Sequence, residues 1–169
     1  MRRRMSEALD RFLAGHATPQ AAWDVCDNSE WMLYLLSGAG YDNSAPSENR
    51  LLLASLSADF AEHALGQMGI SWPEMERLIE AVRLWATDPS EENRQKTLSL
   101  ARETPRGFFL TPDVVGRGVG SVNRADAAAR ASFVAWAAYY SVGCWEVERA
   151  WQCDRIRAIV PICPLSEEP

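Results

Sequence analysis

The residues best suited to acid–base chemistry surround His63, in the stretch DFAEHAL at residues 59–65. A histidine beside carboxylates such as Asp59 and Glu62 could act as a general base. The sequence has no GxSxG nucleophile elbow, and His16, the other histidine, follows Gly15 in a predicted turn. A histidine without a nucleophile or a metal partner is more often structural, so we expect no catalytic residue and no enzymatic activity.

The four cysteines, Cys26, Cys144, Cys153 and Cys163, do not have the spacing of a metal site. No two of them form a CxxC pair, and only two histidines are present as further ligands. We therefore expect no bound metal and interpret the cysteines as small buried hydrophobic residues.

The stretch GRGVGS, residues 116–121, has the glycine content of a phosphate-binding loop. It lacks the lysine of a P-loop, and no predicted strand precedes it as the dinucleotide fingerprint requires. The nearby Arg106, Arg117 and Arg124 leave anion or nucleic-acid binding open as an alternative. We favour a flexible glycine linker and expect no cofactor.

Charge is distributed unevenly along the chain, whose formal net charge is −6. Residues 59–92 are rich in Asp and Glu, whereas residues 94–130 carry Arg94, Lys96, Arg130 and further arginines. The two segments form either two solvated faces that attract each other or an acidic docking face for a basic partner. The net negative charge makes nucleic-acid binding an unfavoured alternative, which would use the Arg94–Arg130 region.

Length and composition predict one globular domain over residues 1–169, of which 47% are hydrophobic and 24% charged. The longest apolar run, Trp31–Leu36, is too short to cross a bilayer. The basic N-terminus MRRRM is not followed by the apolar segment of a secretory signal. We expect a cytoplasmic protein with no membrane association.

Apolar residues at helical spacing, together with capping residues, predict helices along almost the whole chain. Ser71 and Glu74 are predicted to form a capping box for a helix whose apolar stripe includes Leu78, Val82 and Trp85. The predicted helices cover residues 5–14, 19–26, 31–37, 46–67, 73–87, 90–103, 122–142 and 144–160. A Pro/Gly-rich loop is predicted at about residues 104–121.

No segment alternates with the period of a strand, so the predicted fold class is all-α, a compact single-domain bundle of about seven or eight helices. We expect the all-apolar helix at residues 31–36 to lie in its middle. The two segments rich in Trp, Cys and Asp, residues 21–38 and 144–161, are interpreted as two ends of one core. Six tryptophans are expected to anchor that core: Trp23, Trp31, Trp85, Trp136, Trp145 and Trp151.

Several segments together resemble one protein family. They are WDVCDNSEWMLYLLSG at residues 23–38, WPEMERLIEAVRLWATDPSEE at residues 72–92, the Ala-rich stretch at residues 125–140, and ERAWQCDRIRAIVP at residues 148–161. They are similar to segments of the all-helical putative immunity proteins of bacterial polymorphic toxin systems, the group numbered five. The Pro/Gly-rich segment at residues 104–121 departs from the family pattern.

The resemblance implies a non-enzymatic protein that neutralises a toxin or nuclease by binding it directly. The family supplies no catalytic or ligand residues. From the acidic stretch and the exposed-looking aromatics, the predicted contact residues are Trp72, Glu74, Glu76, Glu80, Phe108 and Phe109. The partner is expected to be a basic protein, either a toxin or, for a phage or mobile-element inhibitor, a host defence effector.

Overall fold

The computed structural model describes residues 2–37, 48–105, 115–116 and 124–166, and it confirms an all-α fold. These residues form eight helices and no strand. The helices are α1 (Arg2–Ala14), α2 (Pro19–Val25), α3 (Ser29–Ser37), α4 (Glu48–Met68), α5 (Pro73–Thr87), α6 (Glu91–Glu103), α8 (Arg124–Val142) and α9 (Trp145–Ile159). Within the described ranges, no helix has the length and apolar character needed to cross a membrane.

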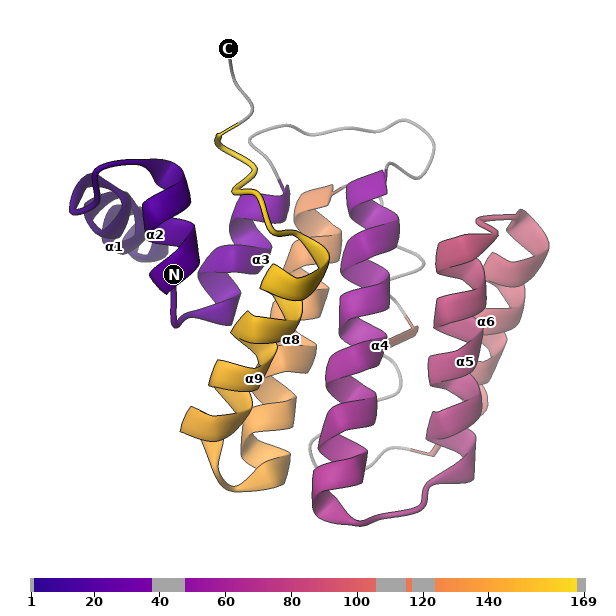
Figure 1. The fold of residues 1–169 in the computed structure, drawn as a ribbon. Coiled ribbons are helices and arrows are strands. Elements are labelled where there is room, and N and C mark those ends of the chain that lie inside the picture. Colours follow the sequence, from indigo (N-terminus) through magenta and orange to yellow (C-terminus); the bar gives the residue numbers. More distant parts are fainter. Residues whose placement is uncertain (1, 38–47, 106–114, 117–123, 167–169) are drawn as a thin grey trace.

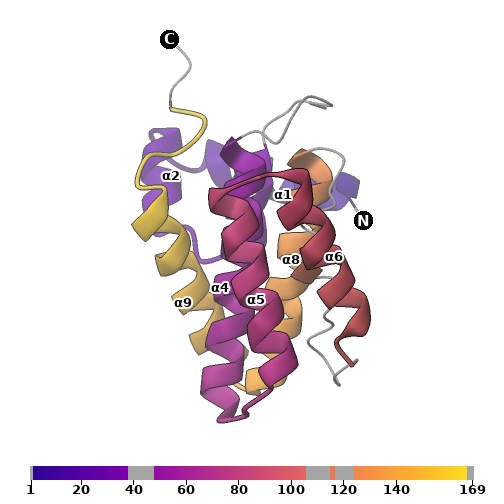
Figure 2. The ribbon, with the colours of Figure 1, turned by 90° about the vertical axis from the view of Figure 1, so that its right-hand side faces the viewer.

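The long helix α4 is the centre of the bundle. It packs against α8 on one side and α5 on the other, and α3 also contacts it. In Figure 1, α9, α4 and α5 stand side by side in the nearer layer, with α8 and α6 behind them. Figure 2 shows the same arrangement from the side, with α9 toward the left of the view, α6 toward the right, and α8 behind α5 and α6. The helix that we expected in the middle, α3, is instead more peripheral, since its Tyr34 is 44% exposed.

The central position of α4 follows from its sequence, which is small or apolar around most of its circumference. Leu53, Leu56 and Phe60 are completely buried, and the alanines between them allow neighbouring helices to approach closely. Burying each large apolar side chain contributes about 1.5–3 kcal/mol before the entropy cost of ordering it.

Polar caps fix where three helices begin. Thr18 accepts a hydrogen bond from Ala21 N at 3.1 Å with Pro19 in the first turn, as predicted for α2. Asn28 Oδ1 accepts from Trp31 N at 3.2 Å at the start of α3, and Ser90 caps α6. Gly69, with φ of +63°, follows the end of α4 in the left-handed conformation that favours glycine.

The predicted capping box of α5 is wrong. The N-cap residue is Trp72, whose side chain makes no capping bond, and the carboxylate that reaches back to the Trp72 N–H is that of Glu76, at 3.2 Å. Because Glu76 lies one helical turn into α5, its carboxylate reaches the N–H of Trp72, whereas the predicted box would have used the N–H groups of Ser71 and Glu74.

The two Trp/Cys/Asp-rich segments meet, which confirms that they are two ends of one core. Trp23 Nε1 donates to Val160 O at 3.0 Å, and Arg157 Nη1 donates to Cys26 O at 2.8 Å. Further along, Gln20 Oε1 accepts from Cys163 N at 2.8 Å. Residues 20–26 are thus held by the last turn of α9 and the segment that follows it.

The tryptophans divide into core and surface residues. Trp23 and Trp85 are buried, and Trp31, Trp72 and Trp151 pack against the core while partly exposed. Two predicted anchors are not in the core: Trp136 is 42% exposed and Trp145 is 60% exposed. On α8 it is the small side chains, among them Ala131, Ala135 and Ala138, that face inward.

Candidate functional site: an acidic groove between α4 and α5

A groove of about 350 Å³ runs between α4 and α5 near the turn that joins them. We call it the α4–α5 groove. Seven residues line it: Glu62, Leu65, Gly66, Ile70, Glu76, Ile79 and Glu80. Leu65 and Ile79 are almost completely buried and Ile70 is 52% exposed, so the groove combines apolar side chains with three carboxylates. Such a surface suits a segment with an apolar anchor and positive charges.

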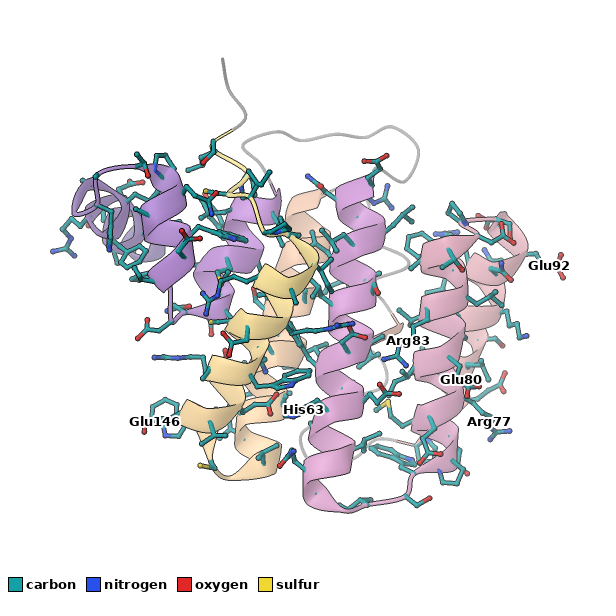
Figure 3. All side chains as sticks on the ribbon, viewed as in Figure 1. His63, Arg77, Glu80, Arg83, Glu92 and Glu146 are labelled. Carbon is teal, nitrogen blue, oxygen red and sulfur yellow. The ribbon has the colours of Figure 1, made fainter. Side chains whose placement is uncertain are left out.

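The carboxylate on the α4 side, Glu62, is already paired. Arg83 on α5 donates to both of its oxygens, at 2.8 and 2.6 Å, and in Figure 3 Arg83 lies between the two helices. These hydrogen bonds hold the pKa of Glu62 below its usual value. Arg83 also donates to Asp59 Oδ1 at 2.8 Å, which ties it firmly to α4.

The two carboxylates on the α5 side have fewer bonding partners than Glu62. Glu76 accepts one hydrogen bond, from Trp72 N. Glu80 forms neither a hydrogen bond nor an ion pair within the part of the chain that the structure describes. Like charges four residues apart on a helix destabilise it by a few tenths of a kcal/mol, about 0.2–0.5. A cation bound between Glu76 and Glu80 would remove that repulsion.

Of the six predicted contact residues, the structure places two in the groove, Glu76 and Glu80. Trp72 lies nearby but packs against the core. Glu74 is half-buried and lines no part of the groove, and its carbonyl accepts a hydrogen bond from Thr104. Phe108 and Phe109 lie outside the described residues.

Sequence reasoning missed the contribution of α4, namely Glu62, Leu65 and Gly66. The signal was present, because Glu62 belongs to the acidic segment at residues 59–92. What the sequence does not give is which side of α4 faces α5, since α4 is apolar on most sides and its apolar pattern leaves the rotation undetermined.

His63 does not pair with the carboxylates beside it in sequence. Its Nδ1 lies 2.7 Å from Oε2 of Glu148 on α9, and its ring stacks on Trp151 with the centroids 3.6 Å apart. Glu148 is 1% exposed, and its other oxygen accepts from Gln152 at 3.0 Å. Gln152 in turn accepts from Ser29, which also hydrogen-bonds to Tyr139.

This chain of hydrogen bonds connects α4, α9, α3 and α8 through the interior. No Ser, Cys or Thr hydroxyl or thiol of the described residues hydrogen-bonds to His63, and His63 lines neither of the two described pockets. Its geometry therefore supports a structural interpretation: a buried carboxylate satisfied by two partners, with the histidine at the edge of the core.

Asp59, the second carboxylate that we considered for acid–base chemistry, is 7% exposed and bridges two arginines. Arg83 of α5 donates to Oδ1, and Arg155 of α9 donates to Oδ2, each at 2.8 Å. One side chain of α4 thus connects the helices on either side of it.

The cysteines are free thiols, and three of the four are buried as predicted. Burial raises the pKa of Cys153 to about 12 and also raises that of Cys26, so neither is a ready nucleophile. Cys144 is exposed, contrary to the prediction. In the described ranges, no three His, Cys, Asp or Glu side chains come together as a metal site would require.

The basic segment at residues 94–130 is only partly described, and one of its arginines is paired within its own helix. Arg94 donates to Glu91 at 2.9 Å, and Lys96 and Arg102 lie on α6, whereas Arg106 and Arg117 lie outside the described residues. Of the glycine-rich stretch at residues 116–121, only Gly116 is described. A Cβ there would lie 2.4 Å from that of Ala101, so this glycine is a close-packing residue in a helix contact.

Comparison with known proteins identified no relative of this chain. A scan against protein-family models and searches of curated proteins and of solved structures gave no match to this chain. The resemblance to immunity proteins therefore remains a prediction.

Proposed function

We propose that the chain is a non-enzymatic inhibitor, an immunity-like module that binds a basic partner protein through the α4–α5 groove. The observation that carries this proposal is the pairing of buried apolar side chains with the carboxylates of Glu76 and Glu80 in one groove. The bound segment would place an apolar side chain against Leu65 and Ile79 and an arginine or lysine beside the two α5 carboxylates.

Two properties of the groove favour a basic protein segment over other ligands. The carboxylates disfavour nucleic acid, whose phosphates they would repel. The apolar lining includes Ile70, 52% of which is exposed, and contact with a partner would remove this surface from water.

A toxin of the same cell and a host defence effector are both compatible with this chemistry. Either is neutralised if the groove covers the basic surface with which it contacts nucleic acid. The proposal concerns the shared feature, a basic protein surface.

The experiment measures binding of the purified chain to each protein encoded by the genes that flank its own. Isothermal titration calorimetry at low and high salt gives the affinity and its electrostatic part. A Glu76→Gln/Glu80→Gln variant removes two charges from the groove while keeping side-chain size, and the amide oxygen introduced at position 76 can still accept from the Trp72 N–H.

The matched control is Glu92→Gln/Glu146→Gln. Both residues are exposed and lie at opposite edges of the molecule, away from the groove (Figure 3). It changes the net charge by the same amount. We expect the groove variant to bind about tenfold more weakly and to lose most of the salt dependence, with the control within about twofold of the unmodified chain. Equal loss in both variants, or no binding to any flanking product, would contradict the proposal.

A further inference from the structure

A row of aromatic side chains lies on the outer surface of α8. Phe133, Trp136 and Tyr140 are 45%, 42% and 52% exposed. They follow one another at spacings of three and four residues, which places them on one stripe of the helix. Their rings touch: the centroids of Phe133 and Trp136 are 5.7 Å apart, and those of Trp136 and Tyr140 are 4.4 Å apart.

The row continues beyond the turn into α9. Trp145 is 60% exposed, and together with Tyr139, Tyr140 and Gly143 it lines a pocket of about 270 Å³. We call the four exposed rings, Phe133, Trp136, Tyr140 and Trp145, the aromatic row. Contiguous apolar surface of this kind on a folded protein commonly marks an interaction site.

The aromatic row carries no ionisable group apart from the tyrosine hydroxyl, in a chain whose net charge is −6. A strongly charged partner would lose hydration there without gaining an ion pair, so the row suits an equally uncharged surface. We propose that this surface is the aromatic row of a second copy of the chain, in a two-fold symmetric dimer.

The spacing of the row makes it self-complementary. Phe133 lies three residues before Trp136 and Tyr140 four residues after it, about 4.5 and 6 Å along the helix axis. Two antiparallel α8 helices related by an axis near Trp136 therefore bring Phe133 opposite Tyr140 of the partner subunit. Each ring meets a ring of similar size, the arrangement that aromatic pairs favour.

The exposed area agrees with a dimer core. Each of the four rings would bury about 150–250 Å² if fully covered, and about half of each is exposed, which leaves roughly 400 Å² per copy. A standard interface buries about 800 Å² per partner, with aromatic residues enriched at its centre. The rings thus supply about half of the area, and neighbouring side chains form the rim.

The dimer leaves the α4–α5 groove accessible. In Figure 1, α4 separates α8 from α5, so the groove and α8 belong to different sides of the bundle. The inference is independent of the proposed function, because it depends on none of the groove residues.

Sedimentation velocity on the full chain at about 100 µM tests the dimer, in the range where small interfaces form. We expect a dimer that high salt does not dissociate, because the centre of the interface is aromatic and the net charges of the two copies repel each other. Trp136→Glu should weaken it about 100-fold. Leu84→Glu, which adds the same charge at a 45% exposed apolar residue of α5, should leave it unchanged.

Mixing two variants tests the two-fold axis itself. Trp136→Glu and Trp136→Lys should each be monomeric alone, with helical content retained by circular dichroism, and should form a mixed dimer when combined, because the axis places the two positions opposite each other. A monomeric unmodified chain, equal effects of Trp136→Glu and Leu84→Glu, or failure of the mixture to associate would overturn the proposal.

Discussion

Replacement of Asp59 by asparagine tests whether the carboxylate between α5 and α9 holds the bundle together. Asp59 is 7% exposed and accepts hydrogen bonds from Arg83 and Arg155 at 2.8 Å. Asparagine preserves the volume, but it removes the charge and directs an N–H₂ group at one of the guanidinium groups. Both kinds of change destabilise a buried polar cluster.

The size of the destabilisation depends on which interactions Arg83 and Arg155 keep in the variant. A hydrogen bond to a charged group contributes about 1.5–3 kcal/mol, so the two contacts set an upper limit near 6 kcal/mol. Arg83 keeps its pairing with Glu62, and the side chains of Arg83 and Arg155 are 36% and 42% exposed, so water replaces part of the loss. We therefore expect Asp59→Asn to lower the free energy of unfolding by about 2–3 kcal/mol.

Urea denaturation followed by tryptophan fluorescence measures this change, and thermal unfolding should show a decrease in Tm of about 4–10 °C. The control is Asp154→Asn, the same substitution in an exposed ion pair with Arg157, where the acid is 75% exposed. It should cost less than about 0.5 kcal/mol. If the two variants unfold at the same urea concentration, the conclusion that Asp59 ties α5 and α9 to α4 is wrong.

Three further predictions concern packing, titration and thiol reactivity. Gly116→Ala should destabilise the fold by about 1–3 kcal/mol in urea denaturation, because its Cβ would overlap that of Ala101, and adding Ala101→Gly should recover part of the loss beyond additivity. The pKa of Glu62 is lower in the folded chain than in the unfolded chain, so its pairing with Arg83 stabilises the fold above the unfolded pKa, and this stabilisation is lost as the pH falls through the folded pKa. NMR titration of the Arg83→Gln variant should show the folded-state pKa of Glu62 rising toward its ordinary value. Reaction of the native chain with an aromatic disulfide reagent should modify one thiol rapidly, that of Cys144, and rapid labelling of a second would contradict the described burial.

The sequence predicts the helices well because their signals are local. The apolar stripe of α5, the Thr18–Pro19 start of α2 and Gly69 after α4 each lie within a few residues of the feature that they define. The predicted capping box of α5 was wrong because Ser71, Glu74 and Glu76 all offer a capping group within the same few residues. The backbone angles at the start of the helix select among them.

Tertiary pairing was much less predictable. Glu148 is 85 residues from His63, and Arg155 is 96 residues from Asp59. From the sequence alone, carboxylates and arginines closer along the chain were equally plausible partners. The aromatic row shows the same limit. An Ala-rich helix has two surfaces that are both apolar, and the one with small side chains was buried because it allows α8 to approach α4 closely.

The contact between residues 20–26 and the segment after α9 has a consequence for synthesis. Hydrogen bonds span 137 residues from Trp23 to Val160 and 143 residues from Gln20 to Cys163. During translation α2 emerges from the ribosome early, but its binding partners emerge only after α9 has been made. Helix α2 therefore cannot form these hydrogen bonds until nearly all of the remaining helices have been translated.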